Sequence, residues 1–580
     1  MIRRCLPWLA LALVLGVTLA LMWGPMRNET TTGDETVFLG AGYSYWLGHR
    51  YYLNIEHPPL MQLWSAFPLL FLDVKQPKDA ERLFDGTFYW PVPIGWDNRE
   101  RWGETFDPAR QPFYHYAVVE GTTYGHTLVY GGENDADKLL FWGRFMQALV
   151  TLATGLLVFL WARSLSNVAG GLLALAAWCF NPLALAYGHL IITDPGIALM
   201  LPLAVWMFSR FLESPRPRTT LVVGLAFGAA LLTKYTAIIL IPIFGALAAV
   251  AWWRQRRSPG ETSARNLLGS LFLIVAVAWG MVLLMYFPHW SPPPPISNAD
   301  AQVLRIPTWF TRLRWLWIPR DYFKGLTIML LHVSNGSRGY LLGQWSDKGW
   351  SYFYPVAMLI KTPVSLLLLL TLAIVVALRR IRRASLAEAA PLIAAAVYLA
   401  CAMTNKADIG VRHVLPIYPL LAVVAGIEFA RAKPRDQLVG WVLCAWLVVT
   451  AFLAHTDYIA YFNELVGGPA NGGAYLIGPD FDWGQDGKQL KTWVKNNHIS
   501  NPYLEFSGPH LTIEYLRIPH RQVQAAQVRE LHDGLFVISA SSLMSTNYDW
   551  LRASSAPVRR IGYTFFVYSL AAASNQPPIQ

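Results

Sequence analysis

The stretch NLLGSLFLIVAVAWGMVLLMY, residues 266–286, decides the class of this fold, because it contains no charged residue. An α-helix of this length rises about 30 Å, which matches the thickness of the hydrocarbon core of a bilayer. A surface helix of a soluble domain carries a continuous polar face, and this stretch has none. It therefore predicts a membrane-spanning helix.

The composition of the whole chain agrees. Of the 580 residues, 54% are hydrophobic and 14% are charged, whereas a soluble domain carries roughly 25% charged residues. The apolar stretches that could cross a bilayer are 5–23, 144–162, 168–187, 196–212, 219–233, 236–253, 266–286, 353–378, 386–403, 411–430 and 437–455. The sequence thus predicts a polytopic α-helical membrane protein with about 11 transmembrane helices.

Basic residues predict the orientation in the cell (inner) membrane. If the N-terminus is cytoplasmic, the cytoplasmic segments carry Arg3, Arg4, Arg163, Arg210, Arg216, Arg218, Arg254, Arg256, Arg257, Arg265, Arg379, Arg380, Arg382, Arg383, Arg431, Lys433 and Arg435. The short outer turns hold only Lys234 and Lys406, with Arg412 at a span edge. This asymmetry predicts a cytoplasmic N-terminus and an extracytoplasmic C-terminus. It also accounts for the net charge of +11, so we expect no nucleic-acid partner.

The predicted spans divide the chain into a transmembrane domain, 1–455, and an extracytoplasmic tail, 456–580. Residues 5–23 lack a nearby A-x-A-like cleavage site, so we expect an uncleaved anchor instead of a signal peptide. Of the two large outer loops, we expect 24–143 to contain short surface helices without a separate core. In the other loop, 287–352, the basic, Trp-rich stretch 304–319 predicts a helix that lies in the membrane interface or packs on protein.

The sequence of the tail predicts a small α/β domain. Residues 484–497 and 542–554 predict helices, whereas 503–507, 534–540 and 559–570 predict strands. The four cysteines, Cys5, Cys179, Cys401 and Cys444, all fall inside apolar runs. Their spacing suggests neither a metal site nor a disulfide framework.

Polar side chains from distant stretches are expected to meet on the outer face. They are Asp34, Glu35, Glu56, His57, Asp194, Lys234, Lys361, Asp408, Arg412 and His413. Carboxylates can remove a proton from an attacking hydroxyl, and lysine and arginine can hold a phosphate. Beside a bilayer, this combination suggests group transfer from a lipid phosphate. No P-loop or dinucleotide fingerprint supports a nucleotide donor.

Each of these residues also has a simpler interpretation. Asp34, Glu35 and Asp194 could cap the helices that follow them. His57 could be a turn residue before two prolines. The basic residues also have simpler roles: Lys234 and Lys361 could snorkel to the interface, and Arg412 could anchor a membrane edge.

Two assignments stay open. Asp34, Glu35, His57 and Asp194 could ligate a divalent metal, but no local spacing requires one, so we assign no metal ligands. In the tail, DFDWGQD (480–486) could be a helix cap and turn. Alternatively, its Asp482 and Gln485 could contact the acceptor or the sugar.

Several motifs together resemble a known family. GDETVFLGAGYSYW (33–46), EHPPL (56–60), HLIITDPGIAL (189–199), LLTKYTAI (231–238) and IGVRHVLPIYPLLAVVAG (409–426) occur in this order. They resemble the GT-C membrane glycosyltransferases. Within these, the likeness is to glycosyltransferase family 39, which is protein O-mannosyltransferase-like, and to aminoarabinose-transferase-like proteins.

The resemblance implies sugar transfer from a polyprenyl-phosphate-linked donor, with inversion at the sugar carbon. It implies that Asp34 is the general base with Glu35 as its neighbour, that Asp194 is a later acid of the site, and that Lys234 binds the donor phosphate. It places Arg412 and His413 near the lipid phosphate. Glu56, His57 and Lys361 are further expected substrate-binding residues. The acceptor, whether protein, lipid or glycan, stays open, because the tail has no MIR-like module.

The alternative is a polytopic transporter or lipid-carrier flippase without transferase activity. Transporters place their binding groups near the middle of the membrane and often contain internal repeats. Here the polar groups are biased outward, and no repeat is evident, so the sequence favours the enzyme.

Overall fold

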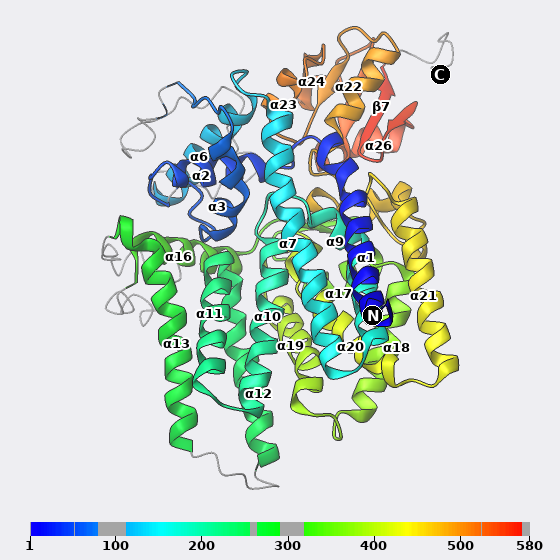
Figure 1. Cartoon of the computed structure of the whole chain (residues 1–580). Coiled ribbons are helices and arrows are strands. Elements are labelled where there is room, and N and C mark those ends of the chain that lie inside the picture. The colour runs from blue at the N-terminus through cyan, green and yellow to red at the C-terminus, as the bar shows by residue number, and fades with distance from the viewer. Residues whose placement is uncertain are drawn as a thin grey trace.

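The computed structural model describes residues 2–51, 53–78, 80, 112–255, 264–290, 318–523 and 525–570. Most of the described chain forms long helices that run side by side, with a small domain at one end of the bundle (Figure 1). The interfacial helix expected over 304–319 lies outside the described residues for 304–317.

The predicted spans correspond to helices. They are α1 (Ile2–Asn28), α7 (Ala136–Leu165), α8 (Val168–Cys179) with α9 (Pro182–Tyr187), α10 (Asp194–Glu213), α11 (Pro217–Thr233), α12 (Leu240–Gln255), α13 (Ala264–Tyr286), α17 (Phe353–Lys361) with α18 (Val364–Arg380), α19 (Leu386–Met403), α20 (Ile417–Arg431) and α21 (Pro434–Leu453). Within the described ranges, seven helices are long and apolar enough to cross a membrane unaided. The prediction of a polytopic helical membrane protein is confirmed.

Two predicted spans are each broken into two helices, α8–α9 and α17–α18. Pro363 has no backbone N–H and cannot continue the ladder of α17. The carbonyls that lose their helical partners there accept hydrogen bonds from the side-chain amide of Asn463, at 2.6 Å from Leu359 and 2.7 Å from Thr362. A break inside the bundle is tolerated because protein groups satisfy the exposed backbone.

The first outer loop contains α2 (Glu35–Trp46), α3 (Leu60–Ala66), the 3-10 helix η1 (Phe67–Phe71) and α6 (Pro112–Tyr130). The prediction that this loop lacks a core of its own is wrong, because Phe38, Leu39, Tyr124 and Leu128 form a separate buried cluster. Helices α2 and α6 approach closely: a Cβ on Gly40 would lie 2.6 Å from the Cα of Gly125. Glycine at both positions therefore lets aromatic side chains on either side pack together.

The tail contains a five-stranded mixed sheet in the order β4-β3-β5-β7-β6. Its strands are β3 (Tyr503–Glu505), β4 (Arg521–Gln522), β5 (Leu535–Ser539), β6 (Arg559–Ile561) and β7 (Phe565–Ser569). Its helices are α22 (Gly487–Asn496), α23 (His510–Tyr515), α24 (Ala525–Val528), α25 (Ala540–Leu543) and α26 (Asp549–Ser554). The single strand expected over 559–570 is wrong: Gly562, with φ +56°, turns the chain into an antiparallel β6–β7 hairpin.

The tail docks on the segment that follows α1. The hydroxyl of Thr30 donates to the carbonyl of Gly484 at 2.6 Å and accepts from the N–H of Gly487 at 2.9 Å. The N–H of Thr30 donates to the carbonyl of Gln485 at 2.8 Å. This buried seam joins residues more than four hundred positions apart and fixes the tail over the first loop.

Asp486, beside this seam, makes the stability of the protein depend on pH. Burial raises the pKa of its carboxyl to about 8, although the Thr564 hydroxyl donates to it and opposes the shift. The unfolded carboxyl ionises near pH 4, so its stabilising contribution is complete below that pH and is lost as pH rises to about 8.

Asp486→Asn keeps an acceptor for Thr564 and removes the ionisation. We expect the variant to melt at least about 2 °C above the wild type at pH 8, with a smaller difference at pH 5. Thermal unfolding in detergent at both pH values measures this, with the exposed Asp549→Asn as the control. An equal difference at the two pH values would contradict the shifted pKa.

Candidate active site

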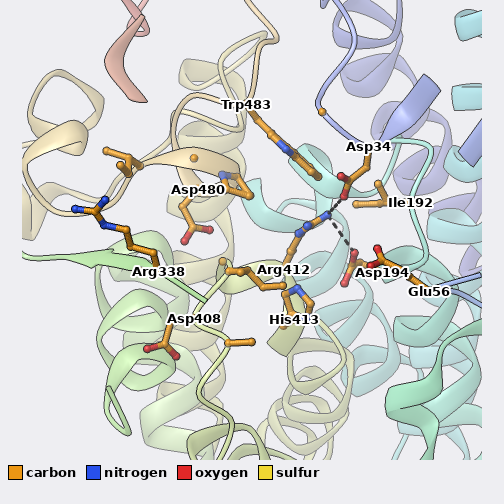
Figure 2. Close-up of a pocket in the computed structure, with 18 of the residues that line it drawn as sticks. Asp34, Glu56, Ile192, Asp194, Arg338, Asp408, Arg412, His413, Asp480 and Trp483 are labelled. Atoms are coloured by element: carbon orange, nitrogen blue, oxygen red, sulfur yellow. Dashed lines mark hydrogen bonds and ion pairs between the residues drawn. The ribbon is translucent and has the colours of Figure 1, made fainter. Parts of the chain in front are cut away.

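A cavity of about 1510 Å³ lies where the first loop, the ends of the spans and the tail meet (Figure 2). Its walls include Asp34 from the first loop, Asp194 from α10, Lys234 from the end of α11, and Arg412 and His413 from the 3-10 helix η5 (Val411–Val414). Residues that the sequence predicts to converge are therefore brought to one cavity, although they come from distant parts of the chain.

Asp34 is the carboxylate of this group that is most open to the cavity. It occupies the N-cap position of α2, but its side chain makes no capping hydrogen bond. Instead its Oδ2 accepts from Nη1 of Arg412 at 2.9 Å, and 37% of the side chain is exposed. The helix-cap interpretation therefore does not describe the Asp34 side chain, which faces a cation and open space.

Asp194 and Lys234 form a buried ion pair beside Asp34. Lys234 follows the last residue of α11 with an extended backbone, which turns its side chain inward at the break before α12. Its Nζ lies 2.6 Å from Oδ1 of Asp194, and both side chains are at least 94% buried. Lys234 therefore does not snorkel, and Asp194 does not act as a helix cap, because the two side chains pair with each other.

Arg412 links the two carboxylates. Its Nη1 lies 2.9 Å from Asp34 and 3.9 Å from Oδ2 of Asp194 (Figure 2). Its guanidinium also lies over the ring of Trp483, 4.2 Å from the centroid. A guanidinium held between an indole face and two carboxylates is oriented as well as neutralised.

The tail motif 480–486 reaches this arginine. Oδ1 of Asp480 accepts from the N–H of Val411 at 2.8 Å and from the hydroxyl of Tyr187 at 3.1 Å. The first bond holds the η5 turn that carries Arg412. Tyr187, Asp480 and Trp483 were not among the site residues expected from the sequence. For the two tail residues, the signal was the density of polar side chains in DFDWGQD.

Glu56, His57 and His413 also line the cavity. Glu56 and His57 lie in the segment between α2 and α3, and the ring of His57 packs against Phe38 with centroids 4.8 Å apart. The structure thus places three further predicted substrate-binding side chains on the wall that carries Asp34 and Asp194.

The expected position of Glu35 is wrong. It is fully buried and does not line the cavity, because its carboxylate pairs with Arg144 through bonds of 2.8 and 2.6 Å. Burial alone would raise the pKa of Glu35, but the Arg144 guanidinium lowers it below its usual range. Glu35 therefore holds the start of α2, next to Asp34, and does not touch a substrate. Arg144 could have been noticed as a cation at the edge of an apolar run.

Lys361, Asp482 and Gln485 are also buried away from the cavity surface. Nζ of Lys361 donates to the carbonyls of Ile459 and Asp480 at 2.8 and 2.6 Å. Gln485 bonds within its own motif, to Trp483 and Phe481. The predicted contacts of these three residues with substrate are therefore wrong, because the hydrogen bonds of Lys361 and Gln485 hold the tail motif in place and Asp482 bonds to Ser541 behind the cavity wall.

No group of three or more His, Cys, Asp or Glu in the described part of the chain is arranged to hold a metal ion. On the cavity wall, Lys234 pairs with Asp194, and Arg412 pairs with Asp34 and Asp194.

Residues 136–286 match the family described as dolichyl-phosphate-mannose-protein mannosyltransferase. Over that segment the chain is similar to protein mannosyltransferases. The matched segment contains Asp194 and Lys234. Over this segment, which contains the motifs 189–199 and 231–238, the match confirms the resemblance to protein mannosyltransferases. No curated protein matches the chain.

Solved structures give weaker likenesses. ArnT from Cupriavidus metallidurans bound to undecaprenyl phosphate is 13% identical, with a TM-score of 0.47 over 98% of this chain and 99% of that one. The S. cerevisiae Pmt1–Pmt2 complex bound to its sugar donor is 16% identical, with a TM-score of 0.32 over 49% and 33%. AglB from Archaeoglobus fulgidus is 12% identical, with a TM-score of 0.43 over 96% and 74%. Because all three TM-scores are below 0.5, these likenesses do not indicate the function of this chain.

Proposed function

We propose that this protein is an integral membrane glycosyltransferase that moves a sugar from a polyprenyl-phosphate-linked donor to an acceptor hydroxyl. The observation that carries the proposal is the pairing of an accessible carboxylate, Asp34, with Arg412, beside the buried Lys234–Asp194 pair, on one cavity wall. A base and two cations at one cavity are the groups that displacement of a phosphate by a hydroxyl requires.

The two cations suit the donor phosphate. Lys234 and Arg412 face Asp34 and Asp194, so the four groups are close to neutral together. An arriving phosphate adds negative charge, and it competes with Asp34 for Arg412. Donor binding would then release the Asp34 carboxylate at the moment when a base is needed.

The displacement follows from this arrangement. The Asp34 carboxylate accepts the proton of the acceptor hydroxyl as that oxygen bonds to the anomeric carbon. The bond from this carbon to the phosphate oxygen breaks, and the polyprenyl phosphate leaves with the electron pair. Lys234 and Arg412 stabilise its charge. One displacement inverts the anomeric centre, and no covalent enzyme intermediate forms.

The cavity wall also suits a lipid donor. It includes apolar side chains from the first loop, Phe38 and Ile55, and from α16 (Arg320–Asn335), Ile328 and Met329. Such a wall can accommodate the first units of a prenyl chain, because apolar contact is favourable there.

The arrangement of the spans supports an extracytoplasmic site. Helices α7, α10, α12, α18 and α20 each carry arginine in the last turn. Arg254 bonds to the carbonyl of Ala384, and Arg380 pairs with Glu428, so several of these ends lie together. The positive-inside rule makes this the cytoplasmic end, which leaves the first loop and the tail outside.

Arg412→Lys tests the role of this cation in donor binding. Lysine keeps the charge but loses the planar fork and its stacking on Trp483, so we expect the donor KM to rise about tenfold, or about 1.4 kcal/mol. The assay follows release of polyprenyl phosphate from a polyprenyl-phosphate hexose by protein in nanodiscs. Arg338→Lys, elsewhere on the cavity wall, is the matched control. An unchanged donor KM in Arg412→Lys would remove Arg412 from the phosphate site.

A further inference from the structure

The cavity is larger than one substrate requires. Small-molecule sites typically enclose roughly 300–1,000 Å³, and this cavity encloses about 1510 Å³. Figure 2 shows that Asp34, Glu56 and Asp194 lie at one side, whereas Arg338 and Asp408 lie at the other, beyond Arg412 and Asp480. We call the second side the far arm. It has room for a second substrate whose end would reach the Asp34 carboxylate.

The tail and a short hairpin form the walls of the far arm. The hairpin consists of β1 (Gly339–Leu341) and β2 (Gln344–Ser346), and it contributes Tyr340 and Trp345. The indole N–H of Trp345 donates to the carbonyl of Met544 at 3.0 Å. This bond joins the hairpin to the tail segment 541–547, most of whose residues also line the cavity.

Asp482 positions that tail segment. Its Oδ2 accepts from the N–H of Ser541 at 2.7 Å and from the hydroxyl of Ser507 at 3.2 Å. The Ser541 hydroxyl donates to the carbonyl of Asp482 at 2.9 Å. The motif 480–486 therefore holds Arg412 with Trp483 on one side and orders the wall of the far arm with Asp482 on the other. This explains why so polar a motif is buried.

The chemistry of the far arm is that of a saccharide site. Aromatic rings of Tyr340, Trp345 and Phe506 line the cavity, where their apolar surface can contact the C–H face of a sugar ring; the Arg338 guanidinium lies 4.7 Å from the centroid of Trp345. The lining also includes hydroxyl, amide and carboxylate groups that can bond to sugar hydroxyls: Glu505, Ser541, Ser542, Ser545, Thr546 and Asn547. Oδ1 of Asp408 adds a buried acceptor with no hydrogen-bond partner among the described residues.

We propose that the far arm binds a neutral saccharide as the acceptor, and that the tail domain selects it. The proposal rests on the proposed glycosyltransferase function and deepens it by naming the acceptor class. A hydroxylated peptide is the competing acceptor. The wall favours a sugar because it combines aromatic rings with hydroxyl, amide and carboxylate side chains that can bond to sugar hydroxyls.

The test uses the full-length protein in nanodiscs and two sets of probes. One set contains neutral glucose, galactose and mannose oligosaccharides of two to six units, and the other contains Ser/Thr-rich hexapeptides. Saturation-transfer NMR measures binding without donor, and a transfer assay with polyprenyl-phosphate hexose measures the acceptor KM. The variants are Trp345→Leu, Trp345→Phe and Asn547→Ala. Gln344→Ala, at the neighbouring exposed position of β2, is the control.

We expect an oligosaccharide to bind the wild type, and its Kd and acceptor KM to rise about tenfold in Trp345→Leu and Asn547→Ala. Trp345→Phe keeps an aromatic face and should lose less. The donor KM of these variants should stay within twofold of the wild type. In Gln344→Ala, the oligosaccharide Kd and the acceptor KM should also stay within twofold of the wild type.

Three outcomes would overturn the proposal. They are binding of peptides but of no oligosaccharide, binding of neither probe, and unchanged oligosaccharide binding in both Trp345→Leu and Asn547→Ala. If oligosaccharides bind through the far arm but no donor is consumed, the saccharide site stands and the proposed transferase function fails. The binding and transfer measurements therefore separate the two proposals.

Discussion

Asp34→Asn is expected to lower the rate of sugar transfer by about 10²–10⁴-fold, which is the usual contribution of a positioned general base. The amide has nearly the shape of the carboxylate but cannot take the proton of the acceptor hydroxyl. Because Arg412 would still have Asp194 and the phosphate as partners, donor binding should persist, with a KM within a few-fold of the wild type. Transfer assays in membranes or nanodiscs measure both quantities.

The control for this variant is Glu133→Gln, which removes an exposed carboxylate from the same outer loop. It should transfer sugar at the wild-type rate. Full activity of Asp34→Asn would remove Asp34 from the role of base. A large rise in donor KM with unchanged kcat would instead make Asp34 a binding residue.

Glu35→Gln is expected to destabilise the protein by about 3–5 kcal/mol, as removal of one partner from a buried ion pair does. Arg144 is fully buried, and besides Glu35 it donates to the carbonyls of Met26, Glu29 and Thr30. The guanidinium would keep its charge and lose the group that neutralises it. Thermal unfolding in detergent should show a lower Tm, and activity should fall with the folded fraction.

A partly exposed ion pair provides the comparison for Glu35→Gln. Lys488 and Asp137 lie 2.7 Å apart with partly exposed side chains, so Lys488→Met should cost less than about 1 kcal/mol. The double variant Glu35→Gln/Arg144→Met should be less destabilised than the sum of the single variants, because the uncompensated charge is gone. Equal effects at the buried and exposed pairs would contradict the structural role of Glu35.

The spans were predictable because the bilayer imposes a length and an apolar composition on any helix that crosses it. The breaks in α8–α9 and α17–α18 were not. A proline can kink or break a span, and here the outcome at Pro363 depends on Asn463, which lies a hundred residues later in the chain. The β6–β7 hairpin was missed because one glycine was the only turn signal within an apolar run.

For the candidate site, topology predicted the convergence of Asp34, Asp194, Lys234 and Arg412. Glu35 was expected to join them because it is adjacent to Asp34 in sequence, and that expectation was wrong. Consecutive residues at the start of a helix point about 100° apart, so Asp34 faces the cavity while Glu35 faces Arg144. The same holds in the tail, where Trp483 lines the cavity and Asp482 turns away from it. The far arm combines a hairpin with a tail segment, and no local pattern predicts that pairing.

In the proposed reaction, this cavity transfers a sugar from a lipid phosphate with Asp34 as the base. The direct measurement is a single-turnover reaction of purified protein in nanodiscs with polyprenyl-phosphate hexose labelled in the sugar, with neutral oligosaccharides and Ser/Thr-rich hexapeptides offered as acceptors. The wild type should release polyprenyl phosphate and labelled, anomerically inverted product in equal amounts. Asp34→Asn should bind the donor and form almost neither. An intact donor with the wild type, or equal turnover by the two proteins, would contradict the account.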